Sequence, residues 1–174
     1  MAYSIRSFEE GDAEALALLG RAAIGAIGPE AYTEEQIDAW LSNLAGPEVY
    51  QAQADAGTQI FIATDEEDEP VAYAMLEANG HLDHLYCHPD HTDEGIASSL
   101  LETAALYAKY HGITHLFTEA SEVAKPAFES AGYTAMKKRT FEIEGVEITN
   151  WAMVREIEPA AKESAPKNGR LSNA

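Results

Sequence analysis

The chain has 174 residues, and the 46% that are hydrophobic can bury a sizeable core in a single domain. Its 30 acidic and 11 basic residues leave a formal net charge of −19, which excludes a nucleic-acid binder because such a surface repels polyanions. The N-terminus resembles no signal peptide and no segment approaches the ~20 apolar residues of a membrane span, so we expect a cytoplasmic protein without membrane contact. The lone Cys87 excludes an internal disulfide and gives no metal framework, so no metal is expected.

The acidity has two interpretations. At ~1 M salt the Debye length is only ~3 Å and self-repulsion is screened, so we expect a salt-adapted protein, as in a halophile. The alternative is a mesophilic acidic protein that has a basic substrate or partner. Composition alone does not separate the two.

The first third of the chain predicts one strand and two helices. Residues 3–7 alternate as an opening strand, and the capping-box pattern at 7–10 begins an Ala/Leu-rich helix that ends at one of the glycines at 25 and 28. A second capping box at 33–36 begins the next helix, and Gly46-Pro47 is its predicted stop.

The middle of the chain predicts a hairpin followed by a strand and a helix. Residues 59–64 and 71–78 form strands joined by an acidic turn at 65–70, which we interpret as a solvated hairpin tip. Residues 81–87 form the next strand, and apolar residues at helical spacing predict a helix over 95–110.

The last third predicts a strand at 114–118, a helix over 121–131 that Pro126 complicates, and a terminal hairpin of strands 133–144 and 146–157. Residues 1–157 therefore form one predicted domain. The following tail, 158–174, combines prolines, Asn and Gly, and we expect it to be disordered.

The loop between the strand at 81–87 and the helix at 95–110 is suited to hold an anion. Gly95 and Ala97 keep side chains small where a ligand must approach the backbone, and the free amides and dipole of the helix start attract negative charge. About thirty residues later, residues 121–133 form a second capped helix that ends in the pair Gly132-Tyr133.

Together with Leu85 and Pro89, these segments resemble the GNAT superfamily of acetyl-CoA-dependent N-acetyltransferases over most of residues 3–157. The resemblance implies a mixed α/β (α+β) fold, with a central, mostly antiparallel sheet that is splayed at the acetyl-CoA site and flanked by about four helices. It also implies acetyl transfer from acetyl-CoA, as co-substrate, to a primary amine of a small molecule or peptide by direct attack in a ternary complex. Pairing of the terminal hairpin would give a homodimer.

The resemblance also implies a cofactor site. Backbone groups of the strand before the loop run beside pantetheine, and amides of the loop and helix start bind the pyrophosphate. Ser98 and Ser121 add hydroxyls, although helix-surface and N-cap roles remain open for them. The predicted cofactor-binding residues are Leu85, Tyr86, Cys87, Thr92, Asp93, Glu94, Gly95, Ile96, Ala97, Ser98, Ser121 and Phe128.

The loop departs from the family pattern at three positions. Thr92 replaces the usual Arg or Gln, Asp93 stands where glycine is frequent, and Glu94 stands where a basic residue is frequent. Two carboxylates beside a pyrophosphate cost affinity unless they point into solvent or salt screens them.

Transfer to an amine needs a base for the ammonium and an acid for the departing thiolate. Relatives often carry a tyrosine four residues before the closing glycine, where this chain has Phe128, so the hydroxyl of Tyr133 is the substitute candidate. The base candidates, each with a structural role as the alternative, lie on or just beyond strands: Glu77, Asp83, His84 and Glu119. The predicted catalytic residues are His84, Asp83, Glu119 and Tyr133.

Several other residues bear on the function. His88 and His91 border the loop, but this spacing without a third ligand does not predict a metal site. Tyr32, Trp40 and Tyr50 are candidates for an acceptor pocket, with core packing as the alternative for Trp40. The rival functions are a non-catalytic acyl-CoA-binding module and a salt-adapted interaction protein that keeps only the fold.

Overall fold

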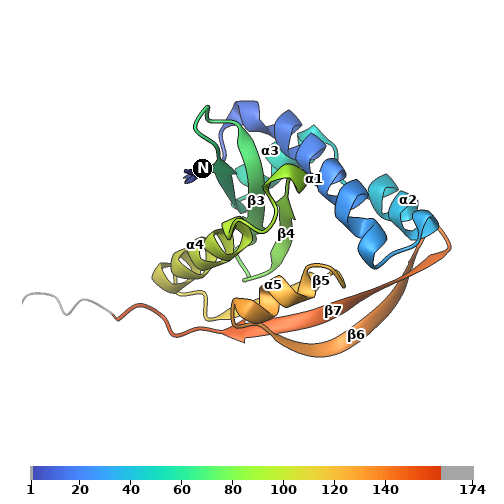
Figure 1. Cartoon of the computed structure of the whole chain (residues 1–174). Helices are drawn as coiled ribbons and strands as arrows, with labels where there is room; N and C mark the ends of the chain where they lie inside the picture. The colour runs from blue at the N-terminus through green and yellow to red at the C-terminus, as the bar shows by residue number, and fades with distance from the viewer. Residues whose placement is uncertain (1, 162–174) are drawn as a thin grey trace, which may run out of the picture.

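The computed structural model describes residues 2–161 of the chain (Figure 1). Its strands are β1 (Ser4–Ser7), β2 (Gln59–Thr64), β3 (Pro70–Leu76), β4 (Leu82–Cys87), β5 (His115–Ala120), β6 (Thr134–Ile143) and β7 (Val146–Glu156). Its helices are α1 (Ala13–Ile27), α2 (Glu34–Ser42), α3 (Pro47–Asp55), α4 (Ile96–Tyr110) and α5 (Lys125–Ser130). None of the helices within residues 2–161 is long and apolar enough to span a membrane.

The strands form two antiparallel sheets, in the order β1-β2-β3-β4 and β5-β7-β6. Strands β2 and β3 are almost wholly buried because helices cover both faces of the first sheet. Alternation along the strands divides the core: Phe61 and Ala74 face α4, whereas Ile62 and Tyr73 face α1 and α3. The predicted mixed α/β architecture with mostly antiparallel strands is therefore confirmed, with α3 as an additional helix.

The two sheets meet at one point and separate beyond it, which confirms the predicted splay. A parallel bridge joins His81 to Phe117, the amide of Phe117 donates to the carbonyl of Gly80 (3.1 Å), and the hydroxyl of Thr118 donates to the carbonyl of Leu82 (2.7 Å). In the described part of the chain, no further ladder connects β4 with β5. The edge of β4 beyond this junction is therefore available to another molecule.

Gly80 permits this close approach of the sheets. Its φ is +94°, and a Cβ at this position would lie 2.0 Å from the carbonyl oxygen of His115. Any side chain here would force the β3–β4 turn away from β5.

The start of α1 differs from the prediction. The predicted capping box at 7–10 is wrong: α1 begins at Ala13, after a 3₁₀ turn at Glu10–Asp12. The carboxylate of Asp12 accepts from the amide of Glu9 (2.8 Å) and from both terminal nitrogens of Arg6 (2.8 and 3.0 Å). The ion pair between Asp12 and Arg6 of β1 therefore fixes this turn. Both residues lie outside the pattern at 7–10 that predicted the helix start.

Prolines explain two further differences. The predicted stop at Gly46-Pro47 instead separates two helices, because Pro47 occupies the first turn of α3, where its missing N–H costs nothing. Pro126 likewise lies in the first turn of α5, which begins at Lys125 and not at the predicted Ser121. The hydroxyl of Ser121 accepts from the amide of Ala124 (3.0 Å) in the turn before that helix.

The hairpins follow the predicted pattern. Glu144 and Gly145 both have positive φ and connect β6 to β7 in a tight turn. In the acidic turn after β2, the carboxylate of Asp65 accepts from the amides of Glu67 (2.9 Å) and Glu69 (3.0 Å). The predicted disordered tail at 158–174 lies mostly outside the described residues, which end at 161.

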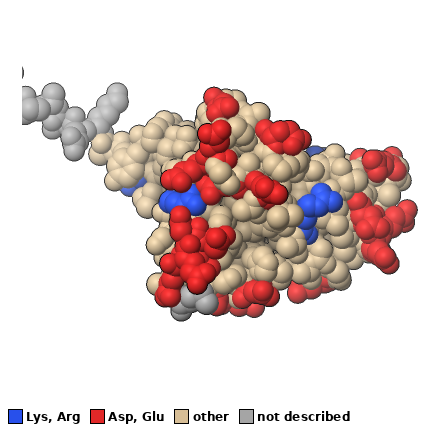
Figure 2. Space-filling view, turned by 90° about the horizontal axis from the view of Figure 1, so that it is seen from above, with Lys and Arg blue, Asp and Glu red and all other residues tan. Residues whose placement is uncertain are grey.

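Acidic side chains are distributed over the surface. Figure 2 shows them across much of the face seen from above, with few basic side chains between them. This distribution agrees with the formal charge of −19 and leaves the salt adaptation of the protein as a prediction.

Candidate active site

An apolar cavity of about 160 Å³ lies where β4, the start of α4, the end of α1 and α5 come together. Five predicted cofactor-binding residues line it: Leu85, Tyr86, Cys87, Ala97 and Ser121. The remaining lining is mostly aliphatic, from Ala23, Ile24, Ile27, Gly28, Trp40, Val123, Ala124 and Ala127. This cavity, called the apolar channel below, therefore lies along the splayed edge of β4. Its shape and lining suit an extended ligand with few charges.

The loop that leads into α4 has the geometry of an anion site. Gly95 has φ +78° as the N-cap of α4, and Asp93 also has a left-handed backbone, with φ +64°. The first amides of the helix, from Ile96 to Ser98, have no carbonyl partners within it and point along its axis. Ser98 is exposed, whereas the hydroxyl of Ser99 donates to the carbonyl of Gly95 (3.2 Å).

The two loop carboxylates are placed differently. The hydroxyl of Tyr3 donates to the carboxylate of Glu94, which lies 3.6 Å from Nδ1 of His91, and the same hydroxyl is 3.0 Å from that nitrogen. Glu94 is therefore held toward β1. Asp93 is exposed, and its charge reaches Cys87: burial first and then Asp93 raise the pKa of this thiol to about 11. Asp93 thus places negative charge near the apolar channel, and within residues 2–161 no ion pair offsets it.

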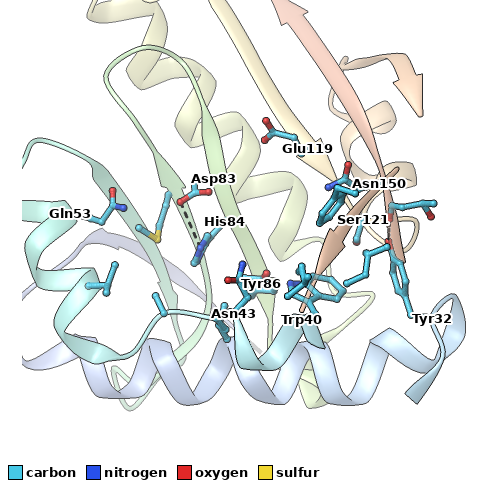
Figure 3. Close-up of a pocket in the computed structure, with 18 of the residues that line it drawn as sticks. Tyr32, Trp40, Asn43, Gln53, Asp83, His84, Tyr86, Glu119, Ser121 and Asn150 are labelled. Carbon is cyan, nitrogen blue, oxygen red and sulfur yellow. Dashed lines mark hydrogen bonds and ion pairs between the residues drawn. The ribbon is translucent and has the colours of Figure 1, made fainter. Parts of the chain in front are cut away.

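A second, larger cavity of about 380 Å³ opens on the other side of β4 (Figure 3). It lies between the α2–α3 segment, β4, β5 and the terminal hairpin, and the predicted acceptor residues Tyr32, Trp40 and Tyr50 line it. Three residues line both cavities, which therefore meet at Trp40, Tyr86 and Ser121. The other lining residues are Asn43, Leu44, Ala45, Val49, Gln53, Met75, Asp83, His84, Glu119, Phe141, Ile143, Ile148, Thr149 and Asn150.

His84 closes a chain of buried polar groups at this cavity. The hydroxyls of Tyr50 and Tyr73 are 2.7 Å apart, and that of Tyr73 is 3.1 Å from Nδ1 of His84. Gly20 of α1 leaves room for the two phenols, since a Cβ there would lie 3.1 Å from the hydroxyl of Tyr73. Burial raises the pKa of both tyrosines and lowers the pKa of His84, although the nearby Asp83 opposes the latter change. The imidazole is therefore neutral at pH 7, with Nε2 3.7 Å from Asp83.

Two predicted base candidates, Glu77 and Glu119, meet on a histidine that the sequence reasoning missed. Nδ1 of His81 is 2.7 Å from the carboxylate of Glu77, and Nε2 is 2.5 Å from that of Glu119. The ring stacks on Phe117, with centroids 4.9 Å apart. Burial opposes the charge on His81, but the two carboxylates outweigh it and raise the pKa. This histidine therefore fixes Glu119 at the sheet junction.

Metal-ligand atoms of Glu77, His81 and Asp83 lie within 4.8 Å of one another, the one such grouping found in residues 2–161. Both ring nitrogens of His81 already face carboxylates, so a metal would have to displace Glu77 or Glu119.

Two predicted site residues lie away from both cavities. Phe128 and Tyr133 are 3% and 4% exposed, and their rings pack edge to face in the core beside α4, with centroids 5.0 Å apart. Neither is among the residues that line these two cavities. Burial raises the pKa of Tyr133 to about 12, so its hydroxyl is a buried neutral group at pH 7.

The comparisons with known proteins agree with this geometry. The Acetyltransferase (GNAT) domain family matches residues 29–155. The chain is 28% identical over 149 residues to the uncharacterized N-acetyltransferase YafP of Escherichia coli strain K12, an alignment that covers 86% of this chain and 93% of that protein.

Solved structures show the same fold. A GCN5-related N-acetyltransferase from Rhodopseudomonas palustris superposes with a TM-score of 0.81 at 29% identity, covering 90% of this chain and 97% of that one. YncA from Salmonella typhimurium, solved with its cofactor acetyl-CoA, superposes with a TM-score of 0.71 at 16% identity, covering 95% of this chain and 99% of that one. The family match over residues 29–155 and these likenesses show that the chain belongs to the GNAT family of acetyltransferases.

Proposed function

We propose that the protein transfers an acetyl group from acetyl-CoA to a primary amine by direct attack while both substrates are bound. The observation that carries this proposal is the meeting of two cavities at Trp40, Tyr86 and Ser121. A thioester that ends the apolar channel would face an amine in the larger cavity. Both reactants would then be held in contact, which replaces a bimolecular collision by an intramolecular one.

The residues of the channel fit the chemistry of acetyl-CoA. Its aliphatic wall suits the pantetheine arm, and the unpaired edge of β4 at Leu85–Cys87 offers backbone groups to the amides of that arm. The loop before α4 ends at Gly95, and amides of Ile96 and Ala97 can receive a phosphate. A backbone N–H of β4 at the junction would polarise the thioester carbonyl.

His84 is the proposed base. It lines the acceptor cavity in its neutral form, and the hydrogen bond at Nδ1 to Tyr73 directs Nε2 away from the phenols. The acceptor's ammonium gives a proton to Nε2, and the nearby carboxylate of Asp83 stabilises the imidazolium that forms. The free amine then attacks the thioester carbon and the C–S bond breaks. The thiolate collects a proton through water while the newly acylated nitrogen releases its second proton to water. Tyr86 stays protonated because burial raises its pKa, so its hydroxyl can donate a hydrogen bond at the junction.

Direct attack is favoured over a covalent acetyl-enzyme. Cys87 lines the channel, but burial and Asp93 raise the pKa of its thiol to about 11, so the thiolate is scarce at pH 7. The thiol hydrogen is directed to the carbonyl of His91 (Sγ to O, 3.3 Å). No base activates it among the contacts of the described residues.

Two measurements test this function. Calorimetry at low salt and in molar KCl should show acetyl-CoA binding, and mass spectrometry of an amine panel should show acetylated products whose formation drops sharply in His84→Gln. Binding without any acetylated product would favour the non-catalytic module. A folded protein without binding at either salt concentration would favour the interaction protein.

A further inference from the structure

The side chains that line the acceptor cavity carry negative charge and no permanent positive charge. None of its lining residues is Lys or Arg, and its two carboxylates belong to Asp83 and Glu119. Amide side chains of Asn43, Gln53 and Asn150 add neutral hydrogen-bonding groups. A substrate with a carboxylate would therefore enter a cavity that offers it no cationic partner and two like charges.

The two carboxylates lie away from the point of transfer. The cavities meet at Tyr86 on β4 and at Ser121 just after β5, whereas Asp83 and Glu119 come earlier on the same two segments, toward the sheet junction. Figure 3 shows Asp83 and Glu119 on one side of the cavity, with Tyr86, Trp40 and Ser121 on the other. At about 3.3 Å per residue, the separation along the strands is about 7–10 Å.

His81 keeps one of these carboxylates in place. It binds Glu119 and Glu77 through its two ring nitrogens and stacks on Phe117. Even a protonated His81 carries one positive charge against the three carboxylates of Glu77, Asp83 and Glu119, so this end of the cavity is negative. A second cation from a substrate would offset that remaining charge.

We propose that the preferred acceptor is an α,ω-diamine or a longer polyamine, with its reacting nitrogen at the junction of the cavities and its second ammonium between Asp83 and Glu119. This inference rests on the proposed function. A zigzag alkyl chain with C–C bonds of about 1.5 Å spans the separation, shortened by the reach of both side chains, with about four to six methylenes. The apolar walls contributed by Met75 and the aromatic rings suit such a chain.

The test compares three acceptors of one length at low salt: 1,5-diaminopentane, n-pentylamine and 5-aminopentanoate. We expect kcat/KM to fall about tenfold from the dication to the monocation, and further for the zwitterion, with optimal diamines of about four to six methylenes. In Glu119→Gln, whose amide oxygen can still accept from His81, the ratio of diamine to monoamine should fall toward one. Glu66→Gln, which removes an equal charge in the exposed β2–β3 turn, should leave the ratio unchanged.

The outcomes separate this inference from the function on which it rests. Equal kcat/KM for 1,5-diaminopentane and n-pentylamine, or a ratio unaffected by Glu119→Gln, would overturn the diamine preference and leave acetyl transfer intact. Absence of acetylated product from every amine, with acetyl-CoA bound, would overturn both. A best acceptor that carries a carboxylate would contradict the cavity assignment directly.

Discussion

Substitutions of Asp93 test whether the loop before α4 binds the pyrophosphate, and they separate the effect of its charge from the effect of its backbone strain. Its φ of +64° belongs to the left-handed region, which favours glycine, and its carboxylate is exposed beside the proposed pyrophosphate site. Asn tolerates the same backbone without the charge, whereas Gly removes both the charge and the strain. Asp93→Asn and Asp93→Gly therefore form a matched pair.

The expected magnitudes follow from simple electrostatics. Two unit charges 4 Å apart in water interact by about 1 kcal/mol, and a pyrophosphate at somewhat longer range gives about 0.5–1 kcal/mol, or about two- to fivefold in affinity. Both variants should therefore bind acetyl-CoA about two- to fivefold more tightly at low salt. Asp93→Gly should also gain about 0.5–1 kcal/mol in the free energy of unfolding, because the left-handed strain is relieved.

The assays are calorimetry of acetyl-CoA binding in about 20 mM and 1 M KCl, and thermal unfolding in the same buffers. At 1 M the Debye length is about 3 Å, so the affinity gain should largely disappear while the stability gain of Asp93→Gly persists. Unchanged affinity of Asp93→Asn at low salt would refute the placement of the pyrophosphate at this loop. An equal affinity gain at both salt concentrations would refute the electrostatic reason.

Three other predictions test separate parts of the structure. Thr92→Arg should tighten acetyl-CoA binding at low salt in calorimetry, and an unchanged Kd would count against the assigned loop. Burial lowers the pKa of His84 below the ordinary histidine value of 6.5, so kcat should fall on the acidic side of the pH–rate profile only below pH 6.5. In His84→Gln this acidic fall in kcat should be absent. The hydrogen bonds of Arg6 lower the pKa of Asp12 from 3.8, although burial opposes this change. The pair of Arg6 and Asp12 therefore stabilises the fold above pH 3.8, and this contribution is lost as the pH falls through the pKa of Asp12 in the folded state. Asp12→Asn should accordingly cost about 1–3 kcal/mol at pH 7 in urea unfolding and much less at pH 2, whereas equal costs at both pH values would contradict the ion pair.

The sequence predicts those parts of the fold that depend on short-range patterns. The turn at Glu144-Gly145 and the helix start at Gly95 follow from glycines, which tolerate positive φ, next to periodic segments. Pro47 shows the limit of such patterns, because a proline that ends one helix can equally begin the next, and only the packing of α3 against α1 decides.

The lining of the candidate site could be predicted from the sequence where it depends only on the position of the backbone. Leu85, Tyr86 and Cys87 border the channel because their strand leads into the loop, which their order in the chain already indicates. His81 was missed because its partner Glu119 is 38 residues away on another strand. His81 and Glu119 are brought together by the junction of the two sheets, which no short stretch of the sequence indicates.

Buried polar groups were the least predictable part of the site. Tyr73 lies within an apolar strand and reads as a core residue, yet its hydroxyl connects Tyr50 with His84. Tyr133 shows the opposite case, because its hydroxyl, close to a family motif in the sequence, is buried in the core beside Phe128. The direction of a side chain depends on packing that the linear sequence does not reveal.

The central claim is that an amine attacks acetyl-CoA directly where the two cavities meet. The measurement that tests it most directly is a single-turnover experiment, in which the enzyme is first saturated with acetyl-CoA and then mixed rapidly with 1,5-diaminopentane while the free thiol is recorded. We predict no thiol release before the amine is added and stoichiometric release afterwards, with the acetyl group on the amine. Release of thiol on mixing with acetyl-CoA alone, with the acetyl group recovered on Cys87, would contradict the claim.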